Sequence, residues 1–444
     1  MSRPLAHDEL LEQCLTVMGR TAGPARTAVY VPGRVELHGK HTDYAGGRSI
    51  VCALERGFRM VLRPRNDGVV CFIPADHPDT GETFAPGERP DQPAGHWVHY
   101  PAATLERLFR DFGGAGTIGG ADAVFLSNIP PAAGMSSSSA FMTAVFLGFA
   151  RLFQLDQTPV WQEHLSGRPA QAAYLGCVEN GSPWGPFGGA AGVGTFGGSE
   201  DHAAMLCSQP GLLGLYRYDP LQPVAQLPWP EDRVLAVMDS GVAADKTGAS
   251  RAAYNRAADR ARRAVEVFNA RRDTLYPHLG ALADGECTHG PAGVLEELER
   301  AERAEPGLTG QRLAARFEQF YREDREWLPA VRTALEEGDP SALGPVCDAS
   351  HRAAADGLEN AVPQTDFLQQ RARELGAEAA SCFGAGFGGS VWALVPASES
   401  GDFGVRWLKA YRRAFPQEAD RGHLIFTRPG PPAGDLPLPA GIGA

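Results

Sequence analysis

The sequence predicts a mixed α/β or α+β protein with room for two domains or one large one. Its 444 residues exceed one domain of ordinary size, ~100–200 residues. Residues 28–126 carry several β-favouring segments mixed with helical patterns, whereas residues 249–375 are mostly helical in pattern. Between them, prolines punctuate residues 210–230 and mark a change in composition. We therefore expect one domain over residues 1–225 and a second over residues 226–427.

The first region is predicted to start with a helix and then to combine strands and helices. Expected elements are a helix at 8–18 capped by Asp8, strands at 28–31, 51–54, 59–63, 69–73 and 122–126, and a helix at 97–109. Residues 74–96 are rich in Pro, Asp and Gly and indicate a surface loop. Residues 181–198 are rich in Gly and Ala and carry no charge, which fits neither a regular helix nor a solvated linker.

The second region shows helical periodicity along most of its length. Helices are expected at 249–272, 291–305, 311–338 and 365–375, and a pair of strands around Gly384–Gly389. Residues 428–444 are rich in Pro and Gly and are predicted to form a disordered tail.

Composition narrows the classes of partner. The net charge of −12 and the lack of a basic stripe argue against nucleic acid. No apolar run approaches the ~18 residues of a membrane span, and no signal-peptide pattern is present. The eight cysteines include no Cys-x-x-Cys pair, as expected of reduced thiols in the cytoplasm. We expect a cytoplasmic protein without a membrane or nucleic-acid partner, either monomeric or weakly dimeric.

The stretch VPGRVELHGKHTDYAGG, residues 31–47, concentrates polar groups at the end of a predicted strand. Arg34, Lys40, His41 and Asp43 lie within ten positions, and only three lysines occur in the whole chain. Donors and acceptors fixed on a strand-to-turn transition suit a small ligand rich in hydroxyl groups. A polar hairpin with an ordinary Gly-Gly turn is the alternative interpretation.

A second motif, IPPAAGMSSSSA at residues 129–140, joins a predicted strand to an apolar helix. Free N–H groups at a helix start bind phosphate, small residues allow close approach, and a serine hydroxyl can hold Mg²⁺. It is not a Walker loop, because the Gly-Lys-Ser/Thr ending is missing. The alternative is a serine-rich turn that caps a core helix. A third motif, Gly384–Gly389, is weak by itself.

These motifs together resemble those of one family. Residues 31–47 closely resemble the galactokinase signature, and residues 129–140 resemble the serine loop of the GHMP small-molecule kinases. Residues 384–389 look like the third GHMP motif, in the same chain order. The resemblance implies an N-terminal ribosomal-protein-S5-like α/β domain and a C-terminal ferredoxin-like α+β domain, with the active site between them. It further implies an ATP-dependent kinase for the anomeric C1 hydroxyl of galactose or a related monosaccharide.

The resemblance also implies roles for individual residues. The sugar would be bound by Arg34, Lys40, His41, Asp43, Asn180 and Tyr254. ATP would be bound by Trp97, Ala133, Gly134, Met135, Ser136, Ser137, Ser138 and Ser139. Mg²⁺ would be held by Ser138 and Glu179. Asp201 would be the catalytic acid with Arg34 beside it, and Glu200 is the fallback for that acid.

Two departures from the family pattern leave alternatives open. Lys40 stands where the family has a Glu that contacts the sugar's 6-hydroxyl, and the candidate acid is displaced beyond residues 181–198. Lys40 could bind the C6 carboxylate in a uronic acid 1-kinase for galacturonate or glucuronate. It could instead pair with a protein acid such as Glu36 or Glu55. The displaced acid keeps a third alternative open, a galactokinase-like sugar sensor without catalysis.

Overall fold

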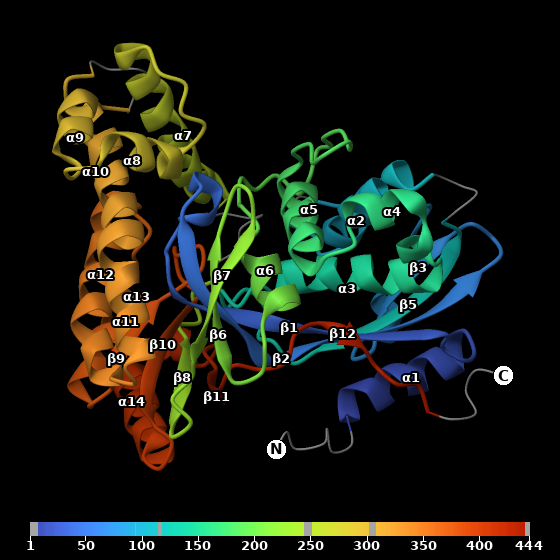
Figure 1. The fold of residues 1–444 in the computed structure, drawn as a ribbon. Helices are drawn as coiled ribbons and strands as arrows, with labels where there is room; N and C mark the ends of the chain where they lie inside the picture. Colours follow the sequence, from blue (N-terminus) through green and yellow to red (C-terminus); the bar gives the residue numbers. More distant parts are fainter. Residues whose placement is uncertain (1–7, 94, 114–117, 244–250, 302–307, 440–444) are drawn as a thin grey trace.

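The computed structural model describes residues 8–93, 95–113, 118–243, 251–301 and 308–439, and in these it contains two β-sheets (Figure 1). The larger sheet has the order β12-β1-β2-β5-β3-β4, and β6 pairs with both β2 and β7. Its strands are β1 (Thr27–His38), β2 (Arg48–Arg65), β3 (Val70–Pro74), β4 (Glu82–Phe84), β5 (Gly120–Ser127), β6 (Leu212–Arg217), β7 (Gln222–Pro228) and β12 (Gly434–Asp435).

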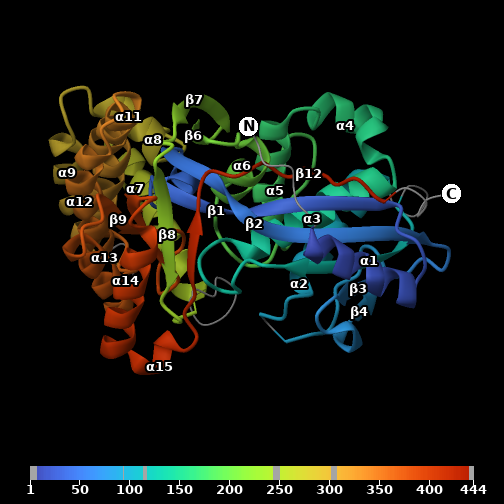
Figure 2. The ribbon, with the colours of Figure 1, turned by 90° about the horizontal axis from the view of Figure 1, so that it is seen from below.

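Helices cover both faces of the larger sheet. They are α1 (Glu9–Thr21), α2 (His99–Asp111), α3 (Ser137–Leu152), α4 (Pro159–His164), α5 (Arg168–Asn180) and α6 (Glu200–Cys207). Helix α1 packs on β2 and β5, whereas α3 and α6 pack on β1 and β2 from the other side (Figure 2). Asp8 caps α1 by accepting a hydrogen bond from the N–H of Leu11, as the sequence predicts.

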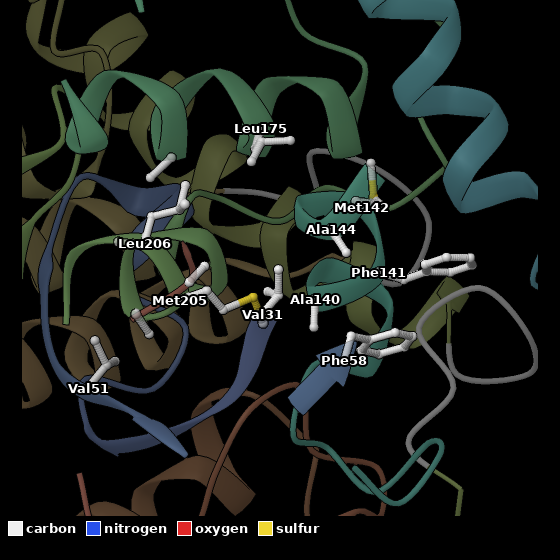
Figure 3. Packing of buried hydrophobic residues seen from close by; sticks show 14 of the residues in the cluster. Val31, Val51, Phe58, Ala140, Phe141, Met142, Ala144, Leu175, Met205 and Leu206 are labelled. Atoms are coloured by element: carbon white, nitrogen blue, oxygen red, sulfur yellow. The ribbon is translucent and has the colours of Figure 1, made fainter. Parts of the chain in front are cut away.

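The core of this region lies between the sheet and α3. Val31 of β1 lies beside Ala140 of α3, Val51 of β2 lies on the side of α6, and side chains of α5 and α6 complete the cluster (Figure 3). Alternation along β1 decides which residues join it, because successive side chains point to opposite faces. Val35 and Leu37 enter this core, which leaves Arg34 and Glu36 for the opposite face.

The second region is built on a four-stranded sheet of order β11-β8-β10-β9. Its strands are β8 (Arg233–Asp239), β9 (Ala379–Cys382), β10 (Ser390–Pro396) and β11 (Leu424–Thr427). Its helices are α7 (Arg251–Arg272), α8 (Leu279–Glu286), α9 (Ala292–Glu299), α10 (Gly310–Tyr321), α11 (Leu328–Glu336), α12 (Leu343–Gly357), α13 (Pro363–Glu374), α14 (Ser400–Ala414) and α15 (Pro416–Ala419). A π-helical segment, Arg322–Trp327, joins α10 to α11 in one long helical rod (Figure 1).

The expected helix at 311–338 is therefore interrupted by a π-helical segment, and the strands expected at 51–54 and 59–63 are one strand, β2. The expected loop at 74–96 contains the short strand β4. Parts of the helices expected at 249–272 and 291–305 lie outside the described residues. The helices α5, α12 and α14 carried no sequence prediction. All eight cysteines are free, and no helix among the described residues is long and apolar enough to cross a membrane.

The chain passes from the larger to the smaller sheet between β7 and β8, residues 229–232. The predicted boundary at 225/226 would cut β7 and lies a few residues too early. The prediction of a disordered tail over 428–444 is wrong for residues 428–439. Here β12 pairs with the edge of β1, with Gly434 opposite Tyr30, and Leu436 and Leu438 pack beside α1. An unpaired strand edge and a small apolar patch order this segment despite its composition.

Candidate active site

A small cavity lies where the end of β1 meets the starts of α6 and α7 and the β9–β10 turn. Segments far apart in the sequence contribute to its wall. The lining residues are Arg34, Glu36, His41, Asp43, Glu179, Gly197, Gly198, Glu200, Asp201, Tyr254, Gly384 and Ala385. Six of the predicted site residues, Arg34, His41, Asp43, Glu179, Asp201 and Tyr254, are therefore brought together here.

Arg34 and Asp201 form a tight pair at this cavity. The Arg34 Nε and Nη2 atoms both lie 2.7 Å from Asp201 Oδ1, and Arg34 Nη1 donates to the carbonyl of Gly134. Burial by itself would lower the pKa of Arg34, but the Asp201 carboxylate raises that pKa above its ordinary value. Asp201 lies in the first turn of α6, where the helix dipole favours an anion. The pair is therefore charged and rigidly held.

The serine loop runs directly beside Asp201. Ser136 Oγ donates to Asp201 Oδ2 at 2.6 Å, and Ser139 Oγ lies 3.1 Å from the same oxygen. Ser136 has a left-handed backbone conformation with φ of 56°, a strained state that non-glycine residues adopt mainly at special sites. Ser137 starts α3, so the loop presents a helix N-terminus. The sequence assigned Ser136 and Ser139 to phosphate but missed their hydrogen bonds to the acid.

The remaining loop positions are built into the fold. Ser390 Oγ donates to the carbonyl of Ala133 at 2.6 Å, and the carbonyl of Met135 accepts the N–H of Arg34 at 3.3 Å. Met135 is buried in the core. Trp97 packs its ring against Phe125 and Phe141, at the first turns of α3. These contacts hold the loop and Trp97 on one side of the larger sheet.

Glu179 connects the loop to the end of α5. Its Oε2 accepts hydrogen bonds from Ser139 Oγ at 2.9 Å and lies 3.0 Å from His202 Nε2. His202 Nδ1 lies 3.0 Å from Thr143 Oγ1, so the imidazole is fixed from both sides. A carboxylate and serine hydroxyls at a phosphate loop are hard oxygen donors, the type that Mg²⁺ prefers together with substrate phosphates. The donor set at Glu179 therefore fits Mg²⁺.

His41, Asp43 and Tyr254 line the opposite wall. His41 Nδ1 lies 2.7 Å from Tyr44 Oη, and its Nε2 lies 3.1 Å from the carbonyl of Ala385. Asp43 Oδ2 accepts the N–H of Gly198 at 3.0 Å, and a Cβ at Gly198 would lie 2.6 Å from that oxygen. Burial raises the pKa of Tyr254 well above its ordinary value, so its hydroxyl remains a donor.

The glycine-rich stretch 181–198 forms part of the wall. The Asn180 side chain donates to the carbonyl of Gly197 at 2.8 Å and accepts the N–H of Ser182, so it ties this stretch together. Asn180 does not line the cavity, and its predicted contact with the sugar is not supported by its orientation. Gly197 and Gly198 line the cavity themselves and place α6 with Asp201 directly after them.

Lys40 points away from the cavity, in contrast to its predicted contact with the sugar. Its Nζ donates to Ser350 Oγ at 2.7 Å and lies 3.9 Å from Glu323 Oε1. The same Glu323 oxygen accepts the N–H groups of Gly39 and Lys40. Glu323 sits on the π-helical segment, where the altered register aims its carboxylate at the turn after β1. The partner of Lys40 is thus a protein acid, but neither Glu36 nor Glu55.

Two acids in the cavity were not predicted as sugar contacts, Glu36 and Glu200. Burial raises the pKa of Glu36 to about 7. Burial, and next the neighbouring Glu36, raise the pKa of Glu200 well above its ordinary range. The alternation of β1 was the available signal, since Glu36 lies two residues after Arg34 and so shares its face.

Comparisons with known proteins agree with this arrangement. The galactokinase galactose-binding signature matches residues 18–64, and the GHMP kinases N-terminal domain matches residues 99–174. The chain is 26% identical to the galactokinase of Pyrococcus furiosus over 395 residues, covering 89% of this chain and 96% of that protein. It is 29% identical to the galactokinase of Roseiflexus sp. over 391 residues, covering 87% and 88%.

Solved structures share the fold. Lactococcus lactis galactokinase complexed with galactose superposes with a TM-score of 0.75 at 22% identity, covering 96% of this chain and 98% of that one. L. major mevalonate kinase in complex with R-mevalonate gives a TM-score of 0.53 at 18% identity, covering 92% and 98%. The two-sheet α+β fold and the motifs on it define a GHMP kinase, a phosphotransferase that uses ATP and an alcohol acceptor. Within that superfamily the chain carries the galactokinase galactose-binding signature and is similar to galactokinases over most of its length.

Proposed function

We propose that this protein is an ATP-dependent kinase that phosphorylates the C1 hydroxyl of galactose or a closely related neutral hexose. The observation that carries the proposal is the position of Asp201, which lines the cavity while bound to both Arg34 and the serine loop. A carboxylate here lies between the predicted sugar site and the predicted phosphate site. Phosphoryl transfer depends mainly on such positioning and on charge stabilisation.

The side chains suggest a division of roles. Asp201 would accept the hydrogen bond of the attacking hydroxyl and take its proton as the bond to phosphorus forms. Arg34 would keep Asp201 ionised and stabilise negative charge as the phosphoryl group moves. The N–H groups at the start of α3 would bind the phosphates of ATP. His41, Asp43 and Tyr254 would orient the sugar hydroxyls.

The metal assignment rests on Glu179 and Ser138. Mg²⁺, when bound, neutralises phosphate charge and orients the transferred group. Glu179 would hold it from the end of α5, and the Ser138 hydroxyl, in the first turn of α3, would be the second protein ligand. Ser138→Ala is expected to raise the Mg²⁺ requirement and lower kcat. Superimposable Mg²⁺ titrations of the variant and the wild type would move the metal site away from Ser138.

A uronic acid substrate is not favoured by the cavity. Its lining includes five carboxyl groups, from Glu36, Asp43, Glu179, Glu200 and Asp201. Lys40, the cation on which the uronate alternative depended, is bound to Ser350 and Glu323. A sugar carboxylate would therefore enter a site lined by acids, and each ionised carboxylate among them would repel it at short range.

The test is a panel of free sugars with Mg-ATP. Galactose, glucose, galacturonate and glucuronate are compared by ADP release, and NMR identifies the phosphorylated position. We expect C1 phosphorylation of a neutral hexose, galactose first, and negligible turnover of both acids. Calorimetric binding of galactose without ADP release would support the sensor alternative, and phosphorylation at another carbon would contradict the assigned site.

A further inference from the structure

Glu36 is firmly anchored in the cavity wall. Its backbone carbonyl accepts the indole N–H of Trp392 at 3.1 Å, and its Oε2 accepts the N–H of Gly384 at 3.3 Å. The residue is 3% exposed. Its other oxygen, Oε1, is buried and has no hydrogen-bond partner among the residues that the structure describes. Glu36 also lines the cavity, so one of its carboxylate oxygens is bound to a backbone N–H and the other is buried at the cavity wall.

Buried carboxylate oxygens almost always have partners, because losing water without replacement is unfavourable. The two nearby cations are directed elsewhere: Arg34 binds Asp201 and the Gly134 carbonyl, and Lys40 binds Ser350. Burial, and next the neighbouring Glu36, raise the pKa of Glu200 well above its ordinary value, and a hydrogen bond with Glu200 acts to lower the pKa of Glu36. Neither cation therefore occupies Glu36 Oε1, and the side chain that shares a hydrogen bond with the Glu36 carboxyl group is Glu200, a second acid of the same cavity wall.

We propose that Glu36 is a specificity-determining residue of the sugar site, whose Oε1 accepts a hydrogen bond from a donor substituent on the sugar ring. The donor is a hydroxyl or an ammonium group, and a carboxylate at the same position is rejected. This inference rests on the proposed function, since it assigns a sugar contact within the same cavity. Glu200 serves as a positioning residue whose carboxyl group is hydrogen-bonded to that of Glu36.

The expected effect follows from the chemistry of the acceptor. A hydrogen bond to a charged group that is lost in a buried site lowers affinity roughly ten- to a hundredfold. Deleting the correct sugar hydroxyl and removing the Glu36 acceptor should each produce this loss. Doing both should produce it only once, because the two changes remove the same interaction.

The experiment measures kcat/KM for galactose and its 2-, 3-, 4- and 6-deoxy analogues. Wild type is compared with Glu36→Gln, which keeps an acceptor oxygen without the charge, and with Glu36→Leu, which removes the acceptor. Glu299→Gln, an exposed acid in α9, is the matched control and should behave as wild type. Thermal unfolding checks that each variant is folded. If Glu36→Leu does not fold, the comparison is made with Glu36→Gln.

For wild type, kcat/KM for one deoxy analogue should be roughly ten- to a hundredfold lower than for galactose. For Glu36→Leu, the same comparison should show a difference of less than about threefold. The ratio of kcat/KM for galacturonate to kcat/KM for galactose should be at least about tenfold higher in Glu36→Gln than in wild type, because the variant has no negative charge at this position. A preference for galactosamine that disappears in Glu36→Gln supports the same acceptor with an ammonium donor. The inference would be overturned if every deoxy analogue showed the same loss of kcat/KM in wild type and in both Glu36 variants.

Failure of the two proposals can be told apart by calorimetry of sugar binding without ATP. If no sugar supports ADP release but the deoxy series still shows the Glu36-dependent loss in Kd, the kinase proposal fails and Glu36 remains the acceptor. If galactose is phosphorylated at C1 and the losses are additive at every position, the kinase proposal stands and the Glu36 assignment is wrong.

Discussion

Two buried cations on β1 and the turn after it, Arg34 and Lys40, meet carboxylates in different settings. Arg34 is 1% exposed and lies 2.7 Å from Asp201, whose side chain is 11% exposed and lines the cavity. Lys40 is 2% exposed and lies 3.9 Å from Glu323, whose side chain is fully buried. Asp201 also accepts serine hydroxyls of the phosphate loop, whereas Glu323 accepts backbone N–H groups and Ser350.

The difference teaches that access, and not charge, distinguishes the proposed catalytic pair from a structural one. Burial lowers the pKa of both cations, but in each pair the neighbouring acidic groups outweigh it, the partner carboxylate most: Asp201 raises the pKa of Arg34, and Glu323 raises that of Lys40. Only the first pair has a carboxylate that a ligand can reach. The second pair fastens the turn after β1 to the π-helical segment between α10 and α11.

The largest expected effect is a loss of kcat from a substitution in the Arg34–Asp201 pair. Asp201→Asn should lower kcat by ~10²- to 10⁴-fold, because the amide cannot accept the hydroxyl proton. ATP affinity should stay within a few-fold, since Asp201 is not needed to hold the nucleotide. Steady-state kinetics and calorimetric ATP titration measure the two quantities. Glu200→Gln is the control, and an inactive Glu200→Gln beside an active Asp201→Asn would reverse the assignment of the acid.

At the buried Lys40–Glu323 pair, a substitution should change the stability of the protein. Lys40→Met leaves the buried Glu323 carboxylate without its cation and should lower the free energy of unfolding by about 3–5 kcal/mol. Urea unfolding measures this loss, and the double variant Lys40→Met/Glu323→Gln should recover part of it. The ratio of kcat/KM for galactose and galacturonate should not change in the folded protein. A clear change in that ratio would mean that Lys40 contacts the sugar after all.

Glu36, between the two pairs, should make stability depend on pH. Its pKa is raised by burial from 4.5 to about 7, so the native state binds the proton more tightly than the unfolded chain. Stability from this group is therefore present below the unfolded pKa and is lost as pH rises through about 7, by at most about 3 kcal/mol. Glu36→Gln should be more stable than wild type at about pH 8, and this advantage should shrink towards about pH 5. Parallel pH profiles of unfolding would contradict this.

The smallest effect is expected from Ser350. Its hydroxyl accepts from Lys40 Nζ and donates to Glu323 Oε1, so Ser350→Ala should lower the free energy of unfolding by about 1–2 kcal/mol. Turnover of galactose should remain unchanged, because Ser350 does not line the cavity. Urea unfolding midpoints and kcat, measured on the same preparations, test this prediction. A loss of kcat without a loss of stability would contradict it and would mean that the Lys40–Glu323 pair influences catalysis at the Arg34–Asp201 pair.

The sequence by itself determined the motifs and the elements that carry them. Alternation in β1 sends Val35 and Leu37 to the core and leaves Arg34 on the other face. The Gly-Met-Ser run ahead of an apolar segment predicted the loop before α3, and Asp8 predicted the start of α1. These features depend on local geometry, namely strand alternation, helix periodicity and capping, which neighbouring residues encode.

Only the tertiary structure decided which of these groups share a cavity. Lys40 looked like a sugar ligand, but its carboxylate partner Glu323 lies 283 residues further along the chain. Asn180 binds the glycine-rich stretch, Glu36 faces the sugar cavity, and the tail pairs with the edge of β1. Such contacts form between elements that fold together from distant parts of the chain. Local sequence patterns carry no information about those distances, because the packing of whole elements sets them.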